Sequence, residues 1–210
     1  DRSPSRGLGD VYKRQAQNLG EIIVSAGLFQ YPVHQLGANT TVLDSQTLHQ
    51  SQATHLEEVL GQMPNVNWAG DTQRPRYFQI RGLGELEEYQ GAPNPSVGVL
   101  IDDMDFSSIG GVATLHDIEQ VDVLRGPQGT AFGASALAGM IYIKSHAPTQ
   151  NLEADAQIGL GNDNTSTQSG MLNIPLTTLN SGLRIAAEHL TSDGAYTNAY
   201  LKRHDTNGRA

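Results

Sequence analysis

Apolar and polar side chains alternate with a period of two along residues 152–190. This alternation predicts β-strands with one apolar and one polar face, and the polar runs GNDNTSTQ and TTLNSG divide the segment into antiparallel strands. The predicted apolar face consists of Leu152, Ala154, Ala156, Ile158, Leu160, Leu172, Ile174, Leu176, Leu183, Ile185 and Ala187. A transmembrane β-barrel and a soluble antiparallel sheet with one wet face share this pattern. Periodicity alone leaves the two open.

The region before Pro148 has shorter and less regular elements. Strands are predicted in 20–27, 77–82, 95–106, 115–124 and 140–145, and residues 40–48 are predicted to form a strand and a turn. Leu56, Val59, Leu60 and Met63 recur at helical spacing, which predicts a helix that Thr54 caps and that ends near Gly61 and Pro64. Alternating strands and short helices predict a compact α/β domain, and the composition changes at 147–149.

The segment VDVLRGPQGTAFGASALAGMIYI (121–143) joins two apolar strands through a glycine-rich stretch. It is not a phosphate-binding loop, because the next lysine, Lys144, lies beyond the second strand and Pro127 removes a backbone N–H group. Its glycines, proline and polar residues also leave too little apolar surface for a spanning helix. We therefore expect a strand, a tight turn, a short helical turn and a second strand.

Composition narrows the function classes. The chain of 210 residues contains 23 glycines and only 17% charged residues, as is typical of β-rich exported proteins. It has no cysteine, which excludes a thiolate metal site and a cysteine nucleophile. Its net charge of −9 argues against a nucleic-acid partner. Residues 1–20 are predicted to be a disordered or artefactual tail, because 1–15 resemble translated sequencing-adapter sequence.

Few residues suggest enzymatic chemistry. Asp103 and Asp105 form a D-x-D pattern that holds a divalent metal in some sugar-nucleotide enzymes, although acids at a strand end usually form a solvated turn. The histidines lack zinc-site spacing, and no nucleophile elbow is present. Arg81 and Arg125 each end an apolar strand and precede glycine; a guanidinium there is expected to be half buried against carboxylate or carbonyl partners, with a surface position as the alternative.

Several segments of the chain resemble segments of the TonB-dependent receptors of the Gram-negative outer membrane, and they occur in the same order as in that family. They are HLEEVLGQMPNV, FQIRGLG, VGVLIDDMDF and IEQVDVLRGPQGTAFGASALAGMIYIKS, followed by the alternating strands. The resemblance extends from Glu21 to the C-terminus, and VLRGPQGTAFG is its most specific part. Two departures are Asp102-Asp103, where the family usually has Asp-Gly, and the strand 139–143, which usually reads closer to GVINI.

The resemblance implies a plug domain with a small mixed sheet and short helices at 28–148, followed by the first antiparallel strands of a transmembrane β-barrel at 149–210. Barrels of this class have about 22 strands, so the chain is expected to be a fragment. Residues 21–27 resemble the TonB box, implying contact of Glu21, Ile22, Ile23, Val24, Ser25 and Ala26 with the TonB protein. Plug-structure residues are expected to be Arg81, Gly82, Arg125, Gly126, Pro127, Gly129 and Gly133. Apical ligand contacts are expected from Arg74, Arg76, Tyr77, Tyr89 and Phe106.

The implied function is energy-coupled uptake of a scarce, large ligand, most often a ferric siderophore and sometimes cobalamin or a glycan. The plug would lie inside the barrel lumen in the outer membrane. The partners implied for the receptor are the TonB protein, outer-membrane lipid around the barrel, and a metal chelate or other small-molecule ligand that binds at outward-facing loops. No enzymatic activity and no cofactor are implied. The alternative is a soluble metal-dependent sugar-nucleotide enzyme that uses Asp103 and Asp105. The sequence does not decide the ligand or whether a signalling domain precedes the plug.

Overall fold

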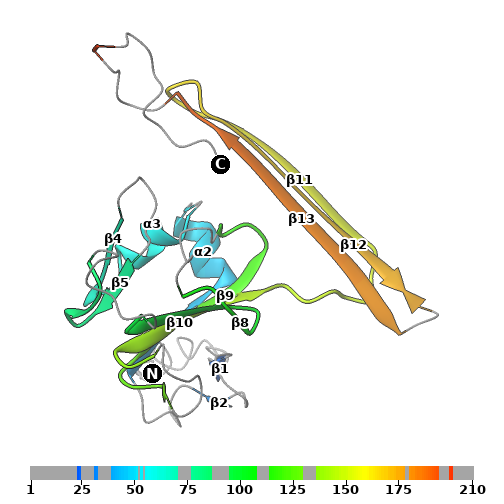
Figure 1. The fold of residues 1–210 in the computed structure, drawn as a ribbon. Coiled ribbons are helices and arrows are strands. Elements are labelled where there is room, and N and C mark those ends of the chain that lie inside the picture. Colours follow the sequence, from blue (N-terminus) through cyan, green and yellow to red (C-terminus); the bar gives the residue numbers. More distant parts are fainter. Residues whose placement is uncertain are drawn as a thin grey trace, which may run out of the picture.

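The computed structural model describes residues 23–24, 31–32, 39–51, 53, 55–70, 77–86, 95–107, 114–129, 136–177, 180–193 and 199–200. Figure 1 shows a globular part, which contains residues 39–145, and an arm of three long strands that leaves it through residues 146–152. Within the described ranges, none of the helices has the length and apolar character needed to cross a membrane.

A five-stranded mixed sheet forms the centre of the globular part. Its spatial order is β3 (Asn39–Asp44), β9 (Ile118–Arg125), β10 (Gly139–Ser145), β7 (Val97–Ile101) and β8 (Met104–Asp105). Strands β10 and β7 are parallel, and the other pairs are antiparallel. The strands predicted at 115–124 and 140–145 are therefore confirmed. The single strand predicted at 95–106 is wrong, because a turn at Asp102 and Asp103 divides it into the antiparallel strands β7 and β8. Together these strands make a mixed sheet.

Both faces of this sheet are buried, which explains the continuous apolar runs of β9 and β10. One face carries Val121, Val123, Ile141 and Ile143 and belongs to the larger core, which the helices cover. The opposite face carries Leu124, Met140 and Tyr142, and Val24 packs there. Val24 lies in β1 (Ile23–Val24), which pairs antiparallel with β2 (Tyr31–Pro32).

Two short helices cover the larger core. Helix α3 (Leu56–Leu60) follows His55, and Leu56, Val59, Leu60 and Met63 are buried as their spacing predicts. The predicted cap, Thr54, lies outside the described residues. Helix α2 (Ser45–Ser51) stands where a turn was expected; Asp44 accepts a hydrogen bond from the Thr47 N–H at 2.8 Å and so caps it.

A smaller antiparallel sheet flanks the helices. It contains β4 (Val66–Ala69), β5 (Tyr77–Ile80) and β6 (Leu83–Gly84), of which only β5 was predicted. Phe78 and Ile80 of β5 are buried in the larger core.

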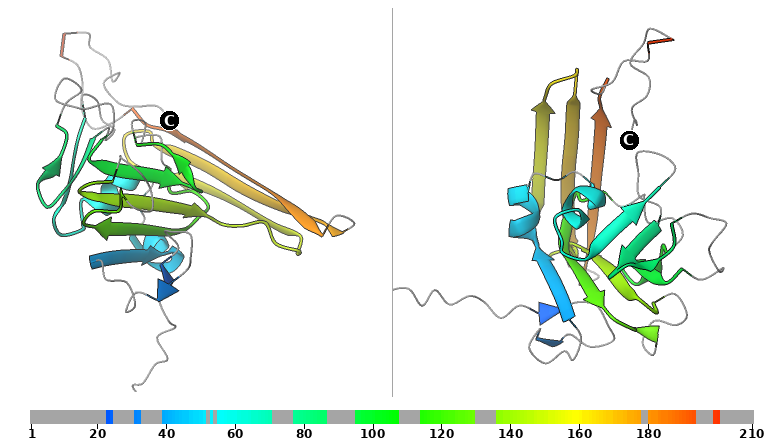
Figure 2. Two further views of the ribbon diagram at one scale, coloured as in Figure 1. Left: turned by 60° about the horizontal axis from the view of Figure 1, so that its bottom comes forward. Right: turned by 90° about the vertical axis from the view of Figure 1, so that its left-hand side faces the viewer.

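The three long strands form a separate antiparallel sheet: β11 (Glu153–Leu160), β12 (Ser166–Leu176) and β13 (Ser181–Thr191) (Figure 2). The register pairs Ala154 with Leu172 and Leu172 with Ile185, so the apolar positions share one face as predicted. This face has no cover among the described residues: Ile158 is 78% exposed and Leu160 86% exposed. The opposite face carries Glu153, Asn173 and Arg184 in one row.

Candidate functional site: the domain junction and the predicted coupling segment

The predicted TonB box lies partly within the described residues. Val24 is completely buried against Leu124, Ala136, Met140 and Tyr142, while Glu21, Ile22, Ser25 and Ala26 lie outside the described residues. A two-residue ladder, Ile23 with Pro32 and Val24 with Tyr31, pairs β1 with β2. Within the described residues, one buried valine side chain therefore docks the segment on the globular part, and a short ladder pairs it with β2.

The two strand-end arginines have different environments. Arg125 is 5% exposed, and its guanidinium donates to Thr41 Oγ1 at 2.6 Å and, at 3.3 Å each, to Asn39 Oδ1 and the Pro64 carbonyl. Burial, and secondarily the nearby charge of Arg81, lowers the pKa of Arg125 below its usual value. The expectation of a buried guanidinium with a carbonyl partner is thus confirmed for Arg125.

For Arg81 that expectation is wrong, because this residue is exposed. It occupies the turn between β5 and β6 with φ +57°, and its N–H donates to the Asn65 carbonyl at 2.8 Å. Gly82 follows with φ +77°. The left-handed turn directs the chain back into β6, which places the Arg81 side chain at the surface.

The glycine-rich segment depends on one glycine that was not among the predicted site residues. A Cβ at Gly139, where φ is +156°, would lie 2.4 Å from the Leu124 carbonyl oxygen, so only glycine allows this approach of β10 to β9. Gly126 has φ +104°, whereas a Cβ at Gly126 or Gly129 would meet no described atom within 4 Å. Pro127 lies exposed between them, and Gly133 lies outside the described residues.

The predicted ligand-contact residues are described only in part. Arg74, Arg76 and Tyr89 lie outside the described residues. Tyr77 is half-buried on β5, and Phe106 packs against the larger core. Glu85 is not a freely solvated acid, because its carboxylate accepts hydrogen bonds from the Ser96 N–H and hydroxyl.

The acids of the D-x-D pattern have structural partners. Asp102 and Asp103 form the turn between β7 and β8 with φ +47° and +68°. The Asp103 carboxylate accepts from Tyr142 Oη at 3.0 Å, and Asp105 accepts from the Ser107 hydroxyl and N–H. Among the residues that the structure describes, no three acidic or histidine side chains gather to hold a metal ion. The described contacts thus give Asp103 and Asp105 structural roles in and after the turn between β7 and β8.

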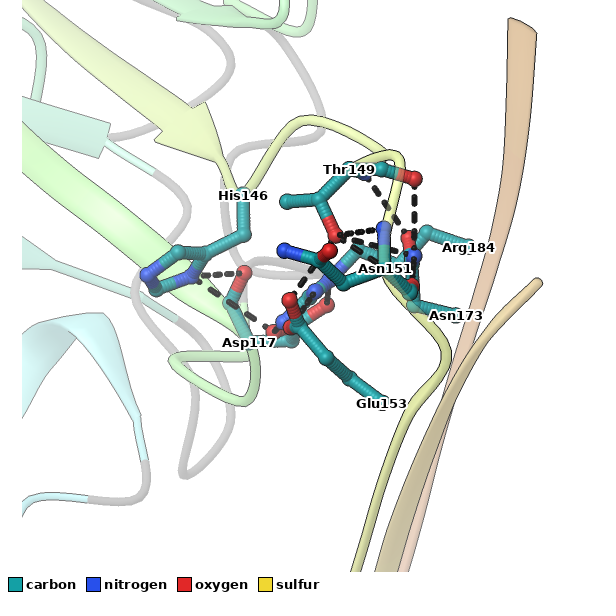
Figure 3. Close-up of polar contacts among 7 residues, drawn as sticks. All are labelled: Asp117, His146, Thr149, Asn151, Glu153, Asn173 and Arg184. Atoms are coloured by element: carbon teal, nitrogen blue, oxygen red, sulfur yellow. Dashed lines mark hydrogen bonds and ion pairs between the residues drawn. The ribbon is translucent and has the colours of Figure 1, made fainter. Parts of the chain in front are cut away.

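A polar cluster joins the globular part to the long strands (Figure 3). Arg184 of β13 forms a two-point ion pair with Asp117, which precedes β9: Nε donates to Oδ2 at 2.7 Å and Nη2 to Oδ1 at 2.6 Å. The side chains of Arg184 and Asp117 are 10% and 13% exposed. Arg184 Nη1 also lies 3.6 Å from Glu153 Oε2. This pair connects residues that are 67 positions apart in the sequence.

Asn173 of β12 fixes the connecting segment in the same cluster. Its side chain is 0% exposed, accepts from the Thr149 N–H at 3.0 Å, and donates to the carbonyl oxygens of Thr149 at 3.0 Å and Asn151 at 2.6 Å. Thr149 Oγ1 donates to Glu153 at 2.8 Å. No pattern in the sequence predicts this cluster, and its only signal is Arg184, a lone cation near a strand end.

Two histidines complete the junction. The His146 N–H donates to the Asp117 carbonyl at 3.1 Å, and its Nδ1 lies 3.5 Å from Asp117 Oδ1. His116 Nε2 lies 3.2 Å from the Gly170 carbonyl oxygen of β12. Burial alone would raise the pKa of the Asp117 carboxyl, but the hydrogen bonds and charge of Arg184, with smaller effects of both histidines, lower it.

The globular α/β domain is attached to the polar face of the long antiparallel strands, and the apolar face of these strands is open. This arrangement is typical of a plug domain joined to the strands of a transmembrane β-barrel. Comparison with known proteins agrees: the family model for the TonB-dependent Receptor Plug Domain matches residues 32–140. The chain belongs to this family. The predicted fold, a mixed α/β plug followed by antiparallel barrel strands, is confirmed.

Individual relatives give the same result. The chain is 27% identical over 160 residues to the vitamin B12 transporter BtuB of Vibrio vulnificus, covering 73% of this chain and 25% of that protein. The ferric yersiniabactin uptake receptor FyuA of Yersinia pestis superposes with a TM-score of 0.60 at 24% identity, covering 74% of this chain and 24% of FyuA.

The outer-membrane ferripyoverdine receptor of Pseudomonas aeruginosa superposes with a TM-score of 0.65 at 18% identity, covering 80% of this chain and 22% of that receptor. This chain thus spans about a quarter of the length of the relatives it matches. These relatives are named as transporters and receptors, and the ferripyoverdine receptor is named as a protein of the outer membrane.

Proposed function

We propose that the full-length protein is an energy-coupled receptor that takes up a scarce, large ligand across the outer membrane. The observation that carries the proposal is the union of the plug with strands whose polar face binds it through Arg184 and Asn173 and whose apolar face is open. Such strands suit contact with lipid outside and a plugged lumen inside. The protein would bind and move its ligand without making or breaking a bond in it.

Coupling to the inner membrane is proposed to use residues 21–26. An extended, β-branched segment offers its backbone N–H and C=O groups to the sheet edge of a partner, here the TonB protein. The docking of Val24 on the globular part supports this role, because the contact that the structure describes consists of one buried side chain and a two-residue ladder, and breaking it costs little free energy. Release of Val24 would make the segment available to the partner.

The preferred ligand class is a ferric siderophore. Arg74, Arg76, Tyr77, Tyr89 and Phe106 combine cationic and aromatic side chains, which suit an anionic, ring-bearing chelate. The relatives that are named as ferric yersiniabactin and ferripyoverdine receptors support the same class. Cobalamin is the second candidate, because the chain is also similar to the vitamin B12 transporter of Vibrio vulnificus.

The experiment is to express the full-length gene in a Gram-negative strain that lacks its own siderophore and cobalamin receptors. Cells are supplied either with labelled ferric catecholate, hydroxamate and mixed-type siderophores or with labelled cyanocobalamin. Uptake of one ferric siderophore is the expected result. Uptake of cyanocobalamin alone would replace the siderophore with the second candidate, and uptake of neither class would overturn the proposed ligand classes.

A further inference from the structure

The cluster in Figure 3, named here the junction clasp, consists of Asp117, His146, Thr149, Asn151, Glu153, Asn173 and Arg184. It joins the turn before β9, the segment after β10 and one residue from each long strand. All three long strands therefore contribute side chains to a single attachment point. This point lies where β9 begins and β10 ends in the plug sheet.

The segment that connects the plug to the long strands is short and makes close contacts. Residues 146–152 separate β10 from β11, and they are folded onto β12 and β13. Gly182 of β13 lies directly under this segment: a Cβ there would be 2.9 Å from Pro148 Cβ and 2.9 Å from the Thr149 carbonyl oxygen. The connection is thus packed as well as hydrogen-bonded.

Opening the clasp would be costly. Asn173 is completely buried, so separation would either leave its amide without partners or require water to enter. The carboxylate of Asp117 and the guanidinium of Arg184 are nearly buried and satisfy each other at two points, and separating them would leave two charges poorly solvated. By contrast, the contacts that the structure describes for β1 are one buried valine and a two-residue ladder.

From this geometry we propose that the junction clasp is a fixed anchor that stays closed while ligand passes. The turn before β9 and the segment after β10 then remain attached to β12 and β13, and the passage opens along a boundary of the plug that these strands do not form. This inference rests on the proposed uptake function. It assigns Asp117, Asn173 and Arg184 the role of positioning residues for the plug.

The test is a reversible covalent lock across the clasp in the full-length receptor. The 210 residues contain no cysteine, and the short Cβ separation between positions 148 and 182 makes Pro148→Cys with Gly182→Cys a suitable pair after a small adjustment toward about 3.8 Å. Each single cysteine variant serves as the control for the substitution itself. Surface binding and uptake are measured in the oxidised and the reduced double variant, with the ligand that the unmodified receptor takes up.

The expected result is efficient disulfide formation with the same uptake rate in the oxidised and reduced states. Loss of uptake on oxidation, restored by reduction while surface binding persists, would overturn the proposal because the clasp would then have to open. Failure of the disulfide to form would also overturn it, because positions 148 and 182 would not be held together. Absence of uptake in the unmodified receptor would instead contradict the proposed function.

A second variant tests the ion pair between Asp117 and Arg184, with the cysteine pair kept at positions 148 and 182. Asp117→Asn in the double-cysteine receptor keeps the side-chain shape but removes the charge that Arg184 binds. The disulfide should form more slowly than in the parent, whereas Asp155→Asn, at an exposed position on the same polar face, should leave the rate unchanged. Equal rates in all three proteins would show that Asp117 does not hold the junction.

Discussion

Val24 of β1 and Met140 of the central strand β10 belong to one buried apolar cluster, and both residues are 0% exposed. This cluster joins the segment that resembles a TonB box to the sheet that forms the plug. A buried valine contributes about 1.5–3 kcal/mol by removal of apolar surface from water. The burial of Val24 therefore contributes an amount of free energy that pairing with a partner's sheet edge can offset.

The close approach at Gly139 predicts a large effect of one added methyl group. Gly139→Ala should destabilise the plug, because its Cβ would lie 2.4 Å from the Leu124 carbonyl oxygen and the strained backbone alone costs about 1–3 kcal/mol. The measurement is the yield of folded full-length receptor in outer-membrane fractions. Gly129→Ala is the control and should keep its yield, since a Cβ there meets no described atom within 4 Å. Equal yields for both variants would contradict this packing.

The ion pair between Asp117 and Arg184 predicts a pH dependence of stability. The folded-state pKa of Asp117 is below its usual value of 3.8, so the stabilisation is present above pH 3.8 and is lost as the pH falls through the folded-state pKa. The difference in unfolding free energy between full-length receptor and its Asp117→Asn variant in detergent should therefore persist above pH 3.8 and shrink below it. A difference in unfolding free energy that increased as the pH fell would contradict this prediction.

The apolar face of β11, β12 and β13 predicts the behaviour of the 210-residue chain in water. Ile158, Leu160 and Ile185 are exposed, and the sheet has open edges, so the chain should associate through these strands. Residues 28–148 alone should remain soluble, because the larger core lies entirely within them and the smaller core loses only Val24. Size-exclusion chromatography checks both. A soluble monomer of the whole chain would assign these strands to a soluble domain.

The proposed ligand contacts predict a loss of affinity without a loss of folding. Arg74→Ala, Arg76→Ala and Tyr77→Ala combined should weaken binding of an anionic ferric siderophore to cells that produce the full-length receptor. Glu85→Gln, which removes a negative charge near the same loops, should leave the affinity unchanged or raise it. Unchanged affinity of the triple variant would remove these residues from the ligand site.

The sequence predicted those features that depend on local periodicity. The period-two pattern of 152–190 determines the register in which Leu172 faces Ile185, and the spacing of Leu56, Val59 and Leu60 determines the buried side of α3. Helix α2 was missed because Leu48 is its only buried residue, so it shows no period; the cap at Asp44 and packing against the core stabilise it.

Other features depend on contacts that no local pattern reports. Arg81 and Arg125 share the same strand-end pattern, yet one is exposed and the other buried, because Arg125 faces Asn39 and Thr41 of the neighbouring strand β3. The junction clasp joins Asp117 to Arg184 across 67 positions, and its residues belong to segments with different periodicities. Such contacts follow from how the plug and the strands pack together.

The central claim is that the full-length protein is an uptake receptor that TonB drives through residues 21–26. The most direct measurement compares surface binding and energy-dependent uptake of the same labelled ligand by cells that produce the full-length receptor, its Ile23→Pro variant or its Val24→Pro variant. Proline removes a backbone donor and fixes φ, so both variants should bind ligand as the parent does but fail to take it up. Full uptake by both proline variants would contradict the claim.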